Sequence, residues 1–327
     1  MADEAVLVDR ASRKFGATVA VDDVSFHVAR GEMFGLIGPD GAGKTTTIRL
    51  LCGLLKADSG RLRVLGHDPV REHAALTREV GYFSQRFSLY GDLSIDENIA
   101  FFAEIHGLRD YEGRRTRLLD MTQLTPFRHR LAEQLSGGMK QKLALACTLV
   151  HEPRLILLDE PTTGVDPVSR REFWKLLSEF LSQGITILMA TPYLDEAERC
   201  ARVGLFSNGR LLAAETPAAL KASLPGVITE IIAVPQERAA AALERAEGYV
   251  ELQHFGERLH VRWQDEDPNV AVRRAREALA TDAIDSSVIR PVPASLEDVF
   301  INRVTRAPAS ITPPASPGGQ PQSPRLS

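Results

Sequence analysis

Long hydrophobic runs are absent from this sequence of 327 residues. A helix that spans a bilayer needs roughly 18 consecutive apolar residues, and no run approaches that length. The first residues, Met-Ala-Asp-Glu, also lack the character of a signal peptide. We therefore expect a soluble, cytoplasmic chain of about two domains, each long enough to bury a core.

Cysteine and excess positive charge are also scarce. The three cysteines, Cys52, Cys147 and Cys200, lie in helix-like segments at spacings that match no metal motif. We expect them to be reduced core residues, which suits the cytosol. The formal net charge of −4 gives the chain no general attraction to nucleic acid, so nucleic acid is not an expected partner.

A glycine-rich segment predicts a phosphate-binding loop. It has the form G-x-x-x-x-G-K-[ST], follows the apolar residues 33–37 and precedes the helix-like residues 45–55. Glycines let successive N–H groups point at phosphate oxygens, and the helix N-terminus adds its dipole. Lys44 would reach the β- and γ-phosphates, and the Thr45 hydroxyl would ligate Mg²⁺. The predicted nucleotide contacts are Gly38, Pro39, Asp40, Gly41, Ala42, Gly43, Lys44, Thr45 and Thr46.

Two more motifs follow this loop. Residues 155–158 form an unbroken apolar run, typical of a strand buried on both faces of a parallel sheet. Asp159 and Glu160 come at its carboxyl end, where ligands bind in open α/β folds. The sequence Ser136-Gly137-Gly138 precedes a helix-like run over 139–150, whose N-terminus offers free N–H donors to an anion.

Together the three motifs resemble those of the ATP-binding-cassette (ABC) ATPases, over about residues 5–220. The resemblance implies a P-loop cassette with a RecA-like α/β core, an antiparallel β layer and a helical insert, and with ATP and Mg²⁺ as cofactors. In that family, the residue at Asp159 holds Mg²⁺ through water, and the residue at Glu160 polarises the attacking water. Ser136, Gly137 and Gly138 would touch ATP held by a second cassette.

The resemblance assigns further roles. Gln85 falls where the family has a glutamine that contacts Mg²⁺ and water, and Phe15 falls where an aromatic ring stacks on adenine. A lone phenylalanine is as often a core residue. The implied catalytic residues are Glu160, Gln85 and Lys44, and the implied metal ligands are Thr45, Gln85 and Asp159.

Two positions depart from the family pattern. Pro192 stands where the family usually has a histidine that contacts the γ-phosphate, and proline offers no side-chain donor and no N–H. Asp40 stands where asparagine is common, and its carboxylate would repel the phosphate unless it were protonated or screened. Both departures surround one phosphate, so we expect slow hydrolysis at this chain's own site. The segment Gly164-Val165-Asp166 matches the D-loop, with valine for leucine.

The chain divides into three predicted parts. Residues 1–220 form the cassette, with the helical insert at about 86–135, a capping box from Ser94 to Glu97, and a hairpin at Asn208-Gly209. Residues 221–304 have the order β-α-β-β-α-β of a small ferredoxin-like α+β module. Residues 305–327 are rich in Pro, Ser and Gly, which predicts a disordered tail.

A short motif narrows the expected function. Residues 295–300, Ser-Leu-Glu-Asp-Val-Phe, resemble the C-terminal motif of drug-resistance and ABC-2 exporter ATPases. We therefore expect an ATP-hydrolysing exporter subunit, peripheral on the cytoplasmic face of the inner membrane. Its partners would be separate membrane permeases and a second ABC ATPase chain, in a homodimer or a heterodimer, with a membrane-fusion adaptor as a further candidate.

Two alternatives remain open. One is a catalytically weak or regulatory cassette paired with a complete ATPase, which Pro192 favours. The other is a soluble ABC ATPase that acts on ribosomes or DNA, although this chain has one cassette and no coiled-coil arm or zinc module.

Overall fold

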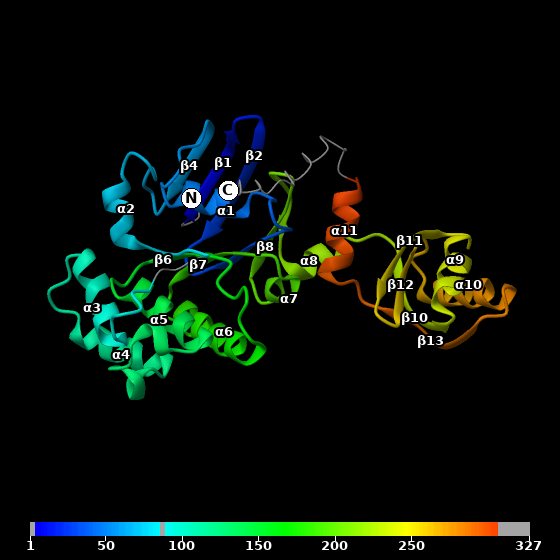
Figure 1. The fold of residues 1–327 in the computed structure, drawn as a ribbon. Helices are drawn as coiled ribbons and strands as arrows, with labels where there is room; N and C mark the ends of the chain where they lie inside the picture. Colours follow the sequence, from blue (N-terminus) through cyan, green and yellow to red (C-terminus); the bar gives the residue numbers. More distant parts are fainter. Residues whose placement is uncertain (1–3, 86–88, 307–327) are drawn as a thin grey trace, which may run out of the picture.

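The computed structural model describes residues 4–85 and 89–306, which form three β-sheets with helices around them (Figure 1). The central sheet has six strands in the order β5-β6-β7-β3-β8-β9, and only β9 runs antiparallel to its neighbour. Its strands are β3 (Met33–Ile37), β5 (Val80–Phe83), β6 (Leu155–Asp159), β7 (Thr186–Thr191), β8 (Arg202–Ser207) and β9 (Arg210–Glu215). The expected α/β core is therefore confirmed.

Alternation along the central strands separates two cores. In β3, Met33 and Ile37 face one core, whereas Phe34 and Leu36 face the other. Side chains of a strand point alternately to opposite faces of a sheet, so both faces need apolar residues when both are covered. The run of buried residues in β3, β6 and β7 follows from this requirement.

The expected antiparallel layer covers one face of the central sheet (Figure 1). Its order is β2-β1-β4, with β1 (Glu4–Phe15), β2 (Thr18–Ala29) and β4 (Ser59–Val64). Helix α1 (Lys44–Leu51) packs between this layer and strands β6 and β7. It ends earlier than the predicted residue 55, because Gly53 has a φ of 72°, a conformation common where helices end.

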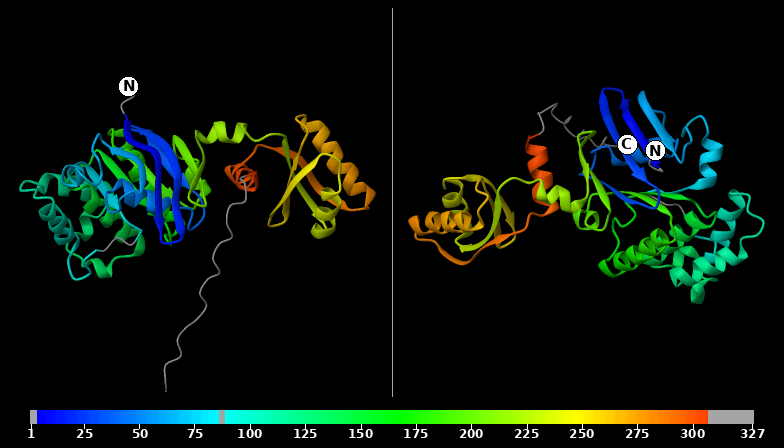
Figure 2. Two further views of the ribbon diagram at one scale, coloured as in Figure 1. Left: turned by 90° about the horizontal axis from the view of Figure 1, so that it is seen from above. Right: turned by 180° about the vertical axis from the view of Figure 1, so that it is seen from behind.

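Helices cover the other face of the central sheet, as the two further views also show (Figure 2). The helical insert lies between β5 and α5, and Ser94 and Glu97 form the expected capping box at its first helix. The helices of the cassette after α1 are α2 (His73–Glu79), α3 (Ile95–Ile105), α4 (Glu112–Thr122), α5 (Gly137–Leu149), α6 (Pro167–Ser182), α7 (Leu194–Ala197) and α8 (Pro217–Ala222), with 3₁₀ turns η1 (Thr125–Phe127) and η2 (Ala132–Gln134).

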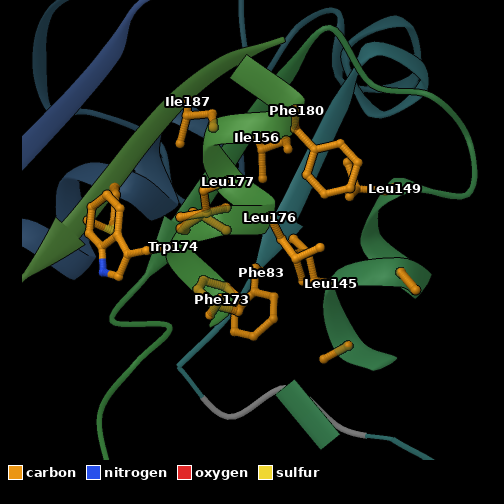
Figure 3. Close-up of a cluster of buried hydrophobic side chains, with 14 of the residues drawn as sticks. Phe83, Leu145, Leu149, Ile156, Phe173, Trp174, Leu176, Leu177, Phe180 and Ile187 are labelled. Atoms are coloured by element: carbon orange, nitrogen blue, oxygen red, sulfur yellow. The ribbon is translucent and has the colours of Figure 1, made fainter. Parts of the chain in front are cut away.

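Helix α6 supplies much of the core on this side (Figure 3). Its apolar side chains Phe173, Leu177 and Phe180 are almost fully buried with Leu149 of α5 and Ile156 of β6. Burying a side chain of this size stabilises a fold by about 1.5–3 kcal/mol. This packing holds α5 and α6, and therefore the loops before them, against the sheet.

The turn Asn208-Gly209 joins β8 and β9 as predicted. Both residues have positive φ, 49° and 78°, as a two-residue type I′ hairpin turn requires. The Gly209 N–H donates to the Ala42 carbonyl at 3.0 Å, so this turn also supports the glycine-rich loop.

The C-terminal part has the predicted βαββαβ order. Its sheet has the order β11-β12-β10-β13, and Trp263 is fully buried under the two helices. The elements are β10 (Val227–Val234), α9 (Gln236–Glu244), β11 (Tyr249–Phe255), β12 (Arg258–Trp263), α10 (Pro268–Thr281) and β13 (Asp285–Val292). The ferredoxin-like topology is therefore confirmed.

The last described helix, α11 (Leu296–Arg306), returns to the cassette and packs on α8 (Figure 1). Leu296 and Val299 are 2% and 1% exposed and belong to the same core as Leu220. Asp298 accepts hydrogen bonds from the N–H and hydroxyl of Ser295 at 2.7 and 2.6 Å, which fixes the start of the helix. The predicted boundary at residue 220 assigns α11 to the C-terminal module, although α11 packs on α8 of the cassette. The predicted tail begins at residue 305, but Thr305 and Arg306 still belong to α11, so the prediction is wrong there; residues 307–327 lie outside the described residues.

Two simple expectations about composition can be compared with the structure. All three cysteines are free and buried. Within residues 4–85 and 89–306, no helix combines the length and the apolar character needed to cross a bilayer.

The packing of α11 gives a first testable prediction. Leu296→Ala should lower the free energy of unfolding by about 2–5 kcal/mol, because it leaves a cavity between α11 and α8. Urea unfolding of the whole chain measures this change. Val304→Ala, at a position 36% exposed on the same helix, should cost less than about 0.5 kcal/mol. Equal losses in the two variants would show that α11 does not stabilise the cassette.

Candidate functional site

The carboxyl ends of β3, β6 and β7 lie side by side in the central sheet. Ile37 of β3 is in register with Thr191 of β7, and Asp159 of β6 is in register with Ala190 of β7. Any side chain that follows these strands therefore projects from one edge. The three predicted segments after these strands meet there.

The glycine-rich loop, residues 38–43, is tightly packed between β3 and α1. Gly43 has a φ of 104°, and a Cβ there would lie 2.4 Å from the Ala20 carbonyl oxygen. A Cβ at Gly38 would lie 2.2 Å from the carbonyl oxygen of Phe206. Only glycine fits such contacts, so these two positions fix the course of the loop.

Lys44 is the first residue of α1 and is only 3% exposed. Its Nζ donates to the carbonyl oxygens of Gly38 at 2.8 Å and Pro39 at 3.0 Å, and lies 3.4 Å from Glu160 Oε1. A buried ammonium group needs such acceptors. The oxygens of a bound anion could take the place of the two carbonyls.

Asp159 and Thr45 form a second contact at this edge. The Thr45 hydroxyl donates to Asp159 Oδ1 at 2.8 Å, whereas Oδ2 is buried with no hydrogen-bond partner among the described residues. Burial raises the pKa of Asp159, the hydrogen bond from Thr45 lowers it, and the charge of Glu160 raises it further. An unpaired carboxylate oxygen beside a hydroxyl suits Mg²⁺, which takes one or two protein ligands together with phosphate oxygens and water.

Glu160 is 8% exposed and has a φ of 52°, which is unusual for a residue with a side chain. Its N–H donates to the Ala190 carbonyl at 2.9 Å, and its Oε2 accepts from Gln85 Nε2 at 3.0 Å. Gln85 follows β5 and is exposed, so it links the carboxylate to the protein surface. Backbone strain of this kind is common at functional sites.

The structure thus brings together five predicted site residues from three segments: Lys44, Thr45, Gln85, Asp159 and Glu160. Within the described part of the chain, no hydrogen bond or ion pair joins Ser136, Gly137 or Gly138 to this group. Ser136 instead caps α5, accepting from the Met139 N–H at 3.3 Å, and it is exposed together with Gly137.

The other predicted nucleotide contacts differ in their exposure. Pro39, Asp40 and Gly41 are exposed, whereas Ala42 is buried and Thr46 is half-buried. Phe15 is 44% exposed at the end of β1, and the guanidinium carbon of Arg13 lies 4.9 Å from its ring centroid. Its exposure favours a binding role over a core role, and stacking on adenine stays a prediction.

Pro192 directly follows β7 and is half-buried. Asp166 caps α6 by accepting from the N–H groups of Val168 and Ser169, both at 3.0 Å. The loop 163–166, in which only Val165 is half-buried and the rest are exposed, therefore ends in a well-fixed helix start. Sequence reasoning missed Glu196, which is buried behind this loop. Its only sequence signal was an acidic residue shortly after a buried strand.

Comparison with known proteins shows the family of this chain. The family model for ABC transporters matches residues 21–163. The Nod factor export ATP-binding protein I of Ralstonia nicotianae is 35% identical over 308 residues, which cover 91% of this chain and 93% of that protein. The chain belongs to the ABC transporter family.

Two further relatives show how much of an ABC transporter protein this chain matches. The probable multidrug ABC transporter ATP-binding protein YbhF of Escherichia coli K12 is 48% identical over 230 residues, but these cover 70% of this chain and only 39% of that protein. A dimeric post-hydrolysis structure of the ATP-binding cassette MJ0796, bound to ADP and Pi, has a TM-score of 0.59 at 26% identity. It covers 64% of this chain and 98% of its own. The predicted resemblance is confirmed.

The raised pKa of Asp159 predicts how the stability of the nucleotide-free protein depends on pH. Because folding raises this pKa above its unfolded value, stability falls as the pH rises through the folded-state pKa. Asp159→Asn removes the buried charge and keeps an oxygen for Thr45, so its melting temperature should exceed that of the wild type at neutral pH. The difference should shrink as the pH is lowered, which thermal melting at several pH values measures.

Asp166 provides a matched control, because its pKa is shifted in the opposite direction to that of Asp159. Hydrogen bonds from Ser169 and then Val168 lower the pKa of Asp166, so its ionised form stabilises the fold. Asp166→Ala should therefore melt at a lower temperature than the wild type at neutral pH. A destabilised Asp159→Asn would show that the Asp159 carboxylate is well compensated without nucleotide.

Proposed function

We propose that this chain is the ATP-binding and ATP-hydrolysing subunit of an ABC-2-type exporter. The observation that carries the proposal is the bonded group of Lys44, Thr45, Gln85, Asp159 and Glu160 at the carboxyl ends of the strands. This group combines a cation for phosphate, a hydroxyl and carboxylate for a metal ion, and an acid for water. Family membership and the names of the relatives support the exporter class.

The roles of the residues follow from their contacts. Lys44 would exchange its carbonyl partners for phosphate oxygens, since its Nζ already lies at the inner side of the loop. Thr45 and Asp159 would hold Mg²⁺, with Gln85 as a further ligand. The ion, when bound, neutralises charge on the phosphates. Glu160 would accept a proton from water, and its bond to Gln85 would orient the carboxylate.

A complete site would need two cassettes. Ser136 and Gly137 are exposed at the start of α5, where free N–H groups favour an anion. They make no described contact with their own chain's phosphate loop, so they are free to reach a second chain's ATP. This arrangement supports a dimer of ABC ATPase chains, in which each site draws residues from both.

A groove supports the proposed membrane partner. It has a volume of about 520 Å³ and is lined by Phe83, Gln85, Leu89, Gly91, Ala132, Glu133, Gly137, Lys140, Gln141 and Ala144. These residues come from the helical insert, from α5 and from the end of β5. An amphipathic helix of a separate permease would fit there, at the cytoplasmic face of the membrane. Because Gln85 both lines the groove and bonds Glu160, such a partner would act on the catalytic acid.

Two variants separate binding from hydrolysis. Lys44→Ala should abolish the rise in melting temperature that Mg·ATP causes, because it removes the buried phosphate contact. Glu160→Gln should keep that rise but lower turnover by about 10²–10⁴-fold, the usual contribution of a general base. Thermal melting and phosphate release measure the two effects. Wild-type turnover in Glu160→Gln would refute the role of this acid.

We further propose that the chain's own site is slow, because Pro192 offers no donor to the γ-phosphate. Pro192→His combined with Asp40→Asn should raise turnover of the isolated chain by about 10²–10³-fold, the typical value of one charge-stabilising donor. Asp40→Asn alone serves as the control for the loop. A wild-type chain that already turns over as fast as the double variant would contradict the slow site.

A further inference from the structure

Glu196 is a buried carboxylate outside the group described above. It lies in the short helix α7 after β7 and is 1% exposed. Its Oε1 accepts from the Thr162 hydroxyl at 2.6 Å and its Oε2 from the Thr191 hydroxyl at 2.7 Å. The Trp174 Nε1 lies 3.4 Å from Oε1, on the side of the ring turned away from the other labelled side chains (Figure 3).

These donors come from three different segments of the chain. Thr162 lies two residues after Glu160, Thr191 ends β7, and Trp174 belongs to α6. The loop 163–166 lies between Thr162 and α6, so Glu196 joins the residue before that loop, and Trp174 in the helix after it, to the end of β7. One carboxylate therefore links the segment before the loop, the end of β7 and helix α6.

Stability alone explains this arrangement poorly. A buried carboxylate costs free energy unless it is paired, and a well-packed apolar residue is often as stabilising. The cationic neighbour of Glu196 is Arg170, whose Nε lies 3.7 Å from Oε1. The hydrogen bonds that Glu196 accepts from the two threonines fix the distance between two catalytic segments. An apolar side chain could not fix that distance.

We propose that Glu196 is a positioning residue for ATP hydrolysis. It holds Thr162 against Thr191, and so sets the backbone of Glu160 and the conformation of loop 163–166. The next residue after Thr191 is Pro192, which cannot donate a hydrogen bond. Glu196 therefore adds a side-chain connection between the end of β7 and Thr162, beside the backbone bond from Glu160 to Ala190. This inference rests on the proposed ATPase activity of the chain.

Glu196→Gln tests the proposal with little change in volume. The Thr191 oxygen already accepts from the Tyr193 N–H at 3.1 Å, so its hydroxyl hydrogen points to the carboxylate. An amide can accept from one threonine but presents N–H to the other. Turnover should fall about 10- to 100-fold, as for a small misplacement of a catalytic group. The KM for ATP and the ATP-induced rise in melting temperature should stay unchanged.

Asp195→Asn is the matched control. Asp195 lies in the same helix, its carboxylate also lies 3.7 Å from Arg170, and its side chain is 73% exposed. It bonds neither threonine, so turnover should equal that of the wild type. Amide hydrogen exchange over residues 161–168 should be faster in Glu196→Gln than in the wild type and in Asp195→Asn, because the loop loses its anchor.

Coupling between residues gives a second readout. Thr162→Val should lower turnover like Glu196→Gln, and the double variant should be no slower than either single one, since all three remove the same link. Additive losses, or wild-type turnover in Glu196→Gln, would overturn the proposal. A wild-type chain without turnover would instead refute the proposed function. Unchanged amide exchange in Glu196→Gln would refute the positioning role whether or not the chain hydrolyses ATP.

Discussion

The buried ammonium group of Lys44 constrains the whole site. Because it is withdrawn from water, it requires acceptors, and it finds them in two loop carbonyls and in Glu160. In the sheet, β7 lies between β3, which precedes Lys44, and β6, which precedes Glu160. The contact therefore crosses the end of β7, whose Ala190 carbonyl also holds the Glu160 N–H. Strand order and a single ion pair together place the acid, the metal ligands and the phosphate loop at one edge.

Features with strong local signals could be predicted from the sequence. The strand 33–37, the capping box from Ser94 to Glu97 and the Asn208-Gly209 hairpin each depend on residues close together in the chain, and all three are present. The phosphate loop and the Asp159-Glu160 pair could be predicted because they lie at the carboxyl ends of buried strands. Their meeting at one edge follows from the parallel sheet, although the individual contacts did not follow from the motifs.

Features that depend on distant partners could not be predicted. Strand β1 extends to Phe15, but its register shifts break the alternation that would reveal it, and Arg10 has a φ of 47°. Strand β4 begins with Ser59 and Gly60, which read as a turn, yet a Cβ at Gly60 would lie 2.2 Å from the Arg10 carbonyl oxygen. The packing of α11 on α8 and the bonds of Glu196 likewise join segments that no local pattern connects.

Glu160 is held through its side chain and through its backbone, by contacts from different segments. Gln85 bonds its side chain from the groove proposed for a permease, so a partner in that groove would act on the carboxylate. The Ala190 carbonyl accepts from its N–H, and Glu196 fixes Thr162 two residues later, so changes at the loop 163–166 would act on the backbone. Hydrolysis would need both parts in place. The geometry therefore allows the groove at Gln85 and the loop 163–166 to act on one acid separately, one through its side chain and the other through its backbone.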